Sequence, residues 1–98
     1  MFVGMAVYDV LFGDVHSLKQ KRGLVRPLVA ELQRHFGVAA AETGMQHLYR
    51  RTEIGVAVVG GEPGHCHAVL ERVERWIAAR HELDLLAATH RLRAIDDE

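Results

Sequence analysis

The sequence predicts a small α+β domain in which strand, helix, strand, strand, helix and strand follow one another. Segments rich in β-branched and aromatic residues alternate with segments whose apolar residues recur at helical spacing. Glycines separate these segments, above all at Gly13, Gly37 and Gly60-Gly61. The chain has 98 residues, which is the size of a single domain with one hydrophobic core. We therefore expect one domain over residues 1–98.

The first two elements are a strand and a long helix. Residues 2–12 are rich in β-branched and aromatic side chains, and Gly13-Asp14 closes this strand. The tetrapeptide Ser17-Leu18-Lys19-Gln20 fits a capping box, so a helix is expected to begin at Ser17 and to end at Gly37. Pro27 removes the helical bond to the carbonyl of Gly23, which predicts a bend at residues 23–27 and not a break.

Two strands, a second helix and a last strand follow. Residues 38–43 are an alanine-rich strand, and residues 52–59 are the most β-branched segment of the chain. Pro63 suits the first turn of a helix. Residues 82–89 predict a final strand that can run on to Ile95, and residues 96–98 are expected to be a frayed tail. This order is the split βαβ, or ferredoxin-like, pattern: a four-stranded antiparallel sheet in the order 4-1-3-2, with two helices on one face.

The first strand is apolar on both of its alternations. Two helices cover only one face of a sheet, so the apolar character of the second alternation predicts that the other face is also buried, against a second copy of the chain. We therefore expect a homodimer. Which alternation faces the helices is left open by the sequence, and the candidate dimer face is Val3, Met5, Val7 and Leu11.

Composition excludes several classes of protein. The formal net charge of -1 argues against a general polyanion binder, since such domains are usually strongly basic. Cys66 is the only cysteine, so no intrachain disulfide can form, which is typical of the reducing cytosol. Residues 1–15 lack the basic start of a signal peptide, and no apolar run approaches the length of a membrane span. We expect a cytoplasmic protein with no membrane partner.

His65-Cys66-His67 resembles a metal-binding cluster at first sight. On a helix, however, residues two apart point to nearly opposite sides, so the two histidines cannot chelate one ion together. His67 and Glu71 share a face, but two ligands do not make a site. Cys66 lies on the apolar stripe of the second helix, which favours a small core residue over a nucleophile. No metal and no cofactor is predicted.

A basic cluster is the most informative feature of the sequence. No acidic residue occurs between Asp14 and Glu31, and Lys19, Arg22 and Arg26 share one stripe of the first helix, opposite its apolar stripe. Such a cluster can hold RNA phosphates, although a charge run is more often solvated surface. The strand at residues 52–59 carries no aromatic residue, which argues against an RRM-type platform for stacked bases. The candidate nucleic-acid contacts are Lys19, Lys21, Arg22, Arg26, Arg50 and Arg51.

Several ordered blocks of sequence resemble the YlxP family, which are small bacterial proteins of unassigned function. The blocks are Ser17-Leu18-Lys19-Gln20-Lys21-Arg22, Ala41-Glu42-Thr43-Gly44, Leu48-Tyr49-Arg50-Arg51 and Ile54-Gly55-Val56-Ala57-Val58-Val59. The resemblance covers residues 1 to about 89 and implies a ferredoxin-like fold with no established catalytic residue. Genes of the family often lie among those for translation initiation and ribosome maturation, which implies a ribosome or RNA partner. His47 and Tyr49 depart from the family pattern, which usually has an acidic residue and a tryptophan there.

Three functions remain open, because a shared fold decides none of them. The first is a non-enzymatic accessory protein that contacts RNA or a ribosomal particle through the basic cluster. The second is a homodimeric module whose open sheet face or dimer cleft binds a small ligand, as ACT-type domains of the same topology do. The third is a hydrolase or transferase that uses His47, Glu42 or Cys66, which ranks last because no catalytic constellation is recognisable.

Overall fold

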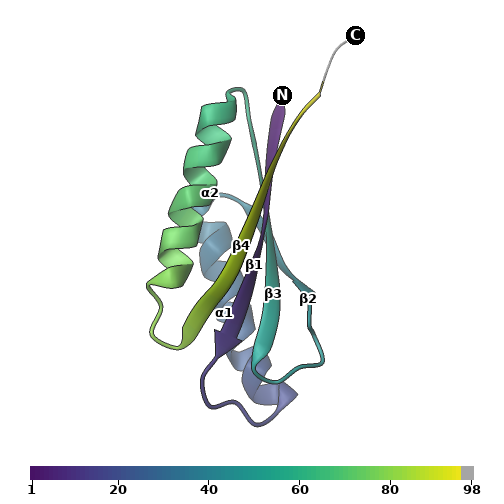
Figure 1. Ribbon diagram of the computed structural model, residues 1–98, viewed down its shortest axis with the longest axis vertical. Helices are drawn as coiled ribbons and strands as arrows, with labels where there is room; N and C mark the ends of the chain where they lie inside the picture. The colour runs from purple at the N-terminus through teal and green to yellow at the C-terminus, as the bar shows by residue number, and fades with distance from the viewer. Residues whose placement is uncertain (96–98) are drawn as a thin grey trace.

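The computed structural model describes residues 1–95 and has the predicted order of elements (Figure 1). These elements are β1 (Phe2–Phe12), α1 (Leu18–Phe36), β2 (Ala39–Gly44), β3 (Arg51–Gly60), α2 (Pro63–Ala78) and β4 (Leu83–Ala94). The strands form one antiparallel sheet in the order β2-β3-β1-β4, which confirms the predicted order 4-1-3-2. Both helices lie on one side of this sheet (Figure 1). The predicted frayed tail, residues 96–98, lies outside the described residues.

The predicted capping box is present at the start of α1, with one difference. The backbone N–H of Gln20 donates to Oγ of Ser17 at 3.1 Å. Oε1 of Gln20 accepts from the N–H of His16 at 2.7 Å, whereas the usual box returns to the N–H of the capping residue itself. Gly37 ends the helix with φ 63°, a left-handed conformation that glycine adopts without a steric penalty.

Pro27 lies inside α1, and the helix continues through it without a break. The helix runs on for nine residues beyond the proline, to Phe36. Pro27 is exposed, so its ring lies on the solvent side of α1 and does not enter the core. The bend expected at residues 23–27 stays a prediction.

The strand boundaries differ slightly from those expected. β2 covers residues 39–44 instead of 38–43, and β3 extends one residue beyond the expected 52–59 at each end. β4 runs to Ala94, the longer of the two predicted extents, because Ala94 pairs with Phe2 at the start of β1. The register between β1 and β4 shifts by one residue, since Asp9 pairs with Ala87 while Val10 pairs with Leu85. Leu86 is therefore the extra residue of a β-bulge on an edge strand.

A single core lies between the sheet and the two helices. The even-numbered residues of β1 face the helices, and Ala6, Tyr8, Val10 and Phe12 are buried there. The hydroxyl of Tyr8 donates to the carbonyl oxygen of Leu70 on α2 at 3.1 Å, and burial raises the pKa of this phenol. The sequence left open which set of β1 residues faces the helices. In the structure the even-numbered residues do, and the odd-numbered residues lie on the face that neither α1 nor α2 covers.

No helix among residues 1–95 is long and apolar enough to cross a membrane.

Candidate nucleic-acid interface

The basic stripe of α1 lies beside the edge strand β2. Lys19, Arg22 and Arg26 are all exposed, and within residues 1–95 none of them has an ion-pair partner. The sequence predicted that all three lie opposite the apolar stripe of α1, and this prediction is wrong for Arg22 and Arg26. Arg22 and Arg26 lie on the flank of α1 next to β2, where they share a groove with Val25 and Val29.

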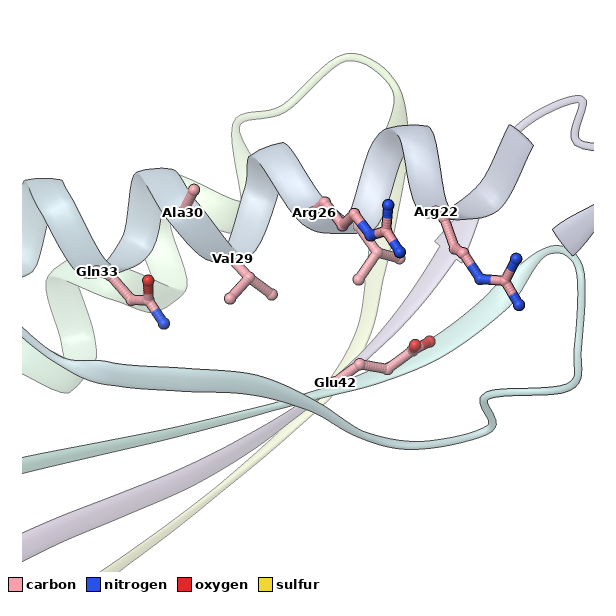
Figure 2. Close-up of a pocket in the computed structure, with 7 residues that line it drawn as sticks. Arg22, Arg26, Val29, Ala30, Gln33 and Glu42 are labelled. Carbon is pink, nitrogen blue, oxygen red and sulfur yellow. The ribbon is translucent and has the colours of Figure 1, made fainter. Parts of the chain in front are cut away.

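This α1/β2 groove has a volume of about 400 Å³ (Figure 2). Arg22 and Arg26 reach from α1 over the groove, and Glu42 rises from β2 on the opposite wall (Figure 2). The groove is lined by Arg22, Val25, Arg26, Val29, Ala30, Gln33 and Glu42. A second hollow of about 190 Å³ shares Arg22, Val25 and Glu42 with it and extends toward Gln46 and His47 in the β2–β3 connection. The volume of the larger hollow falls within the range of small-ligand sites in proteins.

Lys21 does not belong to this exposed surface. Its side chain is 2% exposed, its Nζ donates to the carbonyl oxygen of Met45 at 2.7 Å, and it lies 3.0 Å from Oε2 of Glu42. Oγ1 of Thr52 donates to the same carboxylate oxygen at 2.6 Å. The prediction that Lys21 contacts nucleic acid is therefore wrong, because its ammonium is enclosed and already bonded. The sequence could have indicated that Lys21 is buried, because it lies four residues before Val25 and therefore on the same buried stripe of α1.

Arg50 and Arg51 are adjacent in sequence but lie on different parts of the surface. Nε of Arg50 donates to the carbonyl oxygens of Phe12 at 3.2 Å and Gly13 at 2.6 Å, beside the segment that leads into α1. Arg51 lies on the uncovered face of the sheet, where its Nε and Nη2 donate to Asp9 at 3.0 and 2.6 Å. Arg51 is therefore separated from the basic stripe of α1, and its predicted contact with nucleic acid stays a prediction. Successive strand residues point to opposite faces, and a bidentate carboxylate occupies this guanidinium.

The three residues considered for catalysis do not all lie in one place. Cys66 is fully buried on α2, with its Sγ 3.8 Å from the carbonyl oxygen of Phe2 and 3.9 Å from that of Val58. Glu42 and His47 both line the smaller hollow beside α1, where Glu42 is bonded to Lys21 and Thr52. The structure thus separates Cys66 from the other two candidates.

Two histidines lie close to glutamate side chains of α2. His67 contacts Glu71 one turn along the helix, as their spacing suggested. His90 was not singled out from the sequence, yet its Nε2 lies 3.1 Å from Oε1 of Glu74 and joins β4 to α2. In the part of the chain that the structure describes, no three residues of the types His, Cys, Asp and Glu lie close enough to hold a metal ion.

The fold and the groove together define a small ferredoxin-like domain with a basic hollow between its first helix and an edge strand. The sequence model of a family described as "Protein of unknown function (DUF503)" matches residues 3–90. The chain belongs to this family. The chain is 29% identical over 82 residues to "Uncharacterized protein YlxP" of Bacillus subtilis (strain 168). These aligned residues cover 84% of this chain and 89% of that protein. The resemblance to the YlxP family is thereby confirmed.

A solved structure is similar over nearly the whole chain. It is a de novo designed protein with a ferredoxin fold, determined by solution NMR, with a TM-score of 0.50 and 13% sequence identity. The match covers 97% of this chain and 87% of the designed one. At this identity the likeness establishes the fold alone, and it confirms the predicted ferredoxin-like class.

Proposed function

We propose that this protein is a non-enzymatic accessory protein that binds RNA, either free or within a ribosomal particle. The observation that carries the proposal is the group of exposed cations around the first half of α1: Lys19, Arg22, Arg26 and Arg50. None of the four has a carboxylate partner within residues 1–95. We call these four residues the basic face.

Phosphate is the ligand that suits the basic face best. Guanidinium groups bind phosphate oxygens in a bidentate manner, and an exposed lysine adds a mobile positive charge. The net charge of the whole chain is -1, so the attraction is local to this face and does not extend over the molecule. RNA is therefore expected to dock in one orientation, with α1 toward its backbone.

The salt dependence of binding follows from the number of cations. Each phosphate contact releases condensed counterions and contributes about 0.7 to the negative slope of log affinity against log salt for single strands. Three or four contacts therefore predict a slope of about -2 to -3. An apolar ligand in a dimer cleft, which is the competing function, would bind with little dependence on salt.

The test is a triple variant, Lys19→Ala with Arg22→Ala and Arg26→Ala. We expect weaker RNA binding and a salt slope that is smaller in magnitude by about two. The matched control replaces Arg34, Arg72 and Arg75 with alanine, because these exposed cations lie at the end of α1 and on α2 and their loss changes the net charge equally. The control should bind RNA like the parent protein.

Two results would contradict the RNA role. One is unchanged RNA affinity in the Lys19/Arg22/Arg26 variant. The other is that neither the purified protein nor a pull-down from lysate contains RNA, with a nuclease-treated sample as the reference. Circular dichroism and thermal unfolding establish that the variant is folded.

We also propose that the protein forms a homodimer through the uncovered face of its sheet. Val3, Met5, Val7 and Leu11 of β1 lie on this face, and neighbouring strands add Ala39, Ala41 and Ala57 in the same register. On the β4 side the same face carries Arg91 and Arg93, so its apolar part extends from β1 toward β2. An apolar patch without a covering layer favours burial against another surface. The basic face borders the opposite side of the sheet, so a dimer of this kind leaves the α1/β2 groove open.

A further inference from the structure

The α1/β2 groove has features that a surface for phosphate alone does not need. Val25 and Val29 line it with methyl groups and no charge, whereas the side chain of Ala30 points away from β2 (Figure 2). A phosphate backbone is contacted by exposed cations and gains nothing from an apolar hollow of about 400 Å³ between them and the sheet. The hollow therefore suits a flat, partly apolar group that accompanies the phosphate.

The groove has hydrogen-bond donors on α1, from Arg22 and Arg26, and acceptors from Glu42 of β2 and Gln33 of α1. Arg22 and Arg26 lie one helical turn apart, a like-charged spacing that is unfavourable unless an anion lies between the two side chains. Across the groove, Oε2 of Glu42 accepts from Thr52 and lies beside the ammonium of Lys21, while its Oε1 has no donor among residues 1–95. Gln33 donates through Nε2 to the carbonyl oxygen of Ala40, which leaves its own amide oxygen as an acceptor.

We propose that the groove receives one unpaired nucleotide of the bound RNA strand, an inference that rests on the proposed function. The base lies on Val25 and Val29 beneath the guanidinium groups, and its phosphate is held by Arg22 and Arg26. Arginine planes stack on unpaired bases, and sequence-specific RNA recognition uses bases that are free of a duplex. A base-paired strand cannot place a base in the groove, so single strands bind more tightly than duplexes of equal length.

The acceptor oxygens select among the bases. A carboxylate accepts a hydrogen bond from the exocyclic amino group of cytosine, whereas uracil has a carbonyl oxygen at that position. Lys21 balances the charge of Glu42, so the carboxylate can lie near a phosphate-bearing ligand at a reduced electrostatic penalty. The groove therefore prefers oligo(C) to oligo(U).

The experiment measures fluorescence anisotropy with labelled eight-nucleotide oligo(C) and oligo(U) and with a duplex RNA, at one fixed salt concentration. Gln33→Trp fills the groove, because Gln33 is an exposed residue of α1 whose side chain points toward β2 (Figure 2), and Ala78→Trp places the same side chain on the exposed surface of α2 as the control. We expect Gln33→Trp to weaken oligo(C) binding about tenfold, a typical loss for one stacked base, with the duplex affinity unchanged. Ala78→Trp should alter neither, and oligo(C) should bind the parent protein several-fold more tightly than oligo(U).

The outcomes separate this inference from the proposed function. If the parent protein binds no RNA, both fail together. If RNA binds through the basic face but Gln33→Trp leaves oligo(C) affinity unchanged, or if duplex and single strand bind equally, the groove inference fails and the RNA role stands. Free cytidine monophosphate that binds as tightly as the oligonucleotide would overturn the assignment to an RNA strand.

Discussion

The buried ammonium of Lys21 on α1 lies 3.0 Å from a carboxylate oxygen of Glu42 on β2. This pair joins the helix to the edge strand at the smaller hollow beside the groove, so it helps to set the separation of the two walls that Arg22 and Glu42 form. Lys21 also holds the carbonyl of Met45, which has a left-handed φ of 57° at the start of the β2–β3 connection. A cation that resembles its exposed neighbours in the sequence is thus part of the scaffold of the groove.

Lys21→Met should destabilise the fold. The variant keeps the length of the side chain but leaves Glu42 without its cation, and loss of one partner of a buried ion pair usually costs 3–5 kcal/mol. The side chain of Glu42 is 21% exposed and keeps its bond from Thr52, so we expect a decrease of roughly 2–4 kcal/mol in the free energy of unfolding. Chemical denaturation measures this. Lys19→Met is the matched control and should change stability by less than about 0.5 kcal/mol, so equal losses in the two variants would contradict the scaffold role.

Val7→Glu should convert the proposed homodimer to a monomer. Val7 lies at the middle of β1 on the uncovered face, paired with Gly55 and Thr89, and its side chain is 38% exposed. A carboxylate there would have to leave water at the proposed interface, which is costly even with Arg91 two residues along the neighbouring strand. Light scattering at micromolar concentration should give a dimer mass for the parent protein and for Ala78→Glu on α2, and a monomer mass for Val7→Glu. A monomer mass for the parent protein would rule the interface out.

Pro27→Ala should stabilise the protein. Proline in a helix interior is about 3 kcal/mol less favourable than alanine, because it lacks an N–H and presses on the preceding turn. Pro27 is exposed, so the substitution removes no core contact, and we expect a gain of about 1–3 kcal/mol in thermal or chemical unfolding. Pro63→Ala is the control, because the first turn of α2 needs no bond from that N–H. A loss of stability in Pro27→Ala would mean that a bend in α1 fits the sheet.

Gly4→Ala should destabilise the core. A Cβ at this position would lie 3.0 Å from Cδ1 of Leu70 and 3.2 Å from both Cβ of Cys66 and Cγ1 of Val58. Overpacking of this kind costs typically about 1–3 kcal/mol. Gly64→Ala is the control, since a Cβ there has no neighbour within 4 Å. Equal stability of Gly4→Ala and the parent protein in denaturant would show that α2 shifts away from β1 without cost.

Arg80 makes part of the stability dependent on pH. Its guanidinium lies 2.9 Å from Glu82 and 2.9 Å from Glu31, and it stacks over Trp76. The hydrogen bond from Arg80 lowers the pKa of Glu82 from its ordinary value of 4.5. A lowered carboxyl pKa stabilises the fold above pH 4.5, and this contribution is lost as the pH falls through the lowered pKa.

Arg80→Met tests this linkage while retaining most of the apolar contact with Trp76. The variant should be less stable than the parent protein at neutral pH, and the difference in thermal unfolding should shrink as the pH falls below 4.5. Glu82→Gln should show the same pH dependence of its difference from the parent. A difference for Arg80→Met that is constant across the acid range would mean that packing alone accounts for it.

The features that were predicted correctly from the sequence depend on local chemistry. Ser17 and Gln20 cap a helix because they lie three residues apart, and Gly37 ends it because glycine adopts a left-handed conformation without penalty. The order of strands and helices follows from the periodicity of apolar residues, and the sheet order follows from the few right-handed connections that this order permits. All of these need only residues that are close together in the chain or rules that hold for every chain.

Only the tertiary structure decided which face each polar or apolar set occupies. Both alternations of β1 are apolar, so the covered face became known only when α1 and α2 were placed on the sheet. Arg51 pairs with Asp9 from a position 42 residues away, and Lys21 bonds Met45 from 24 residues away. The α1/β2 groove likewise depends on how closely the helix lies to an edge strand. The sequence by itself therefore determined the elements and their order. The ion pairs and the groove depend on the packing of segments that are distant in the chain. Two lysines or two arginines look alike in the sequence and differ only in the surroundings that the fold gives them.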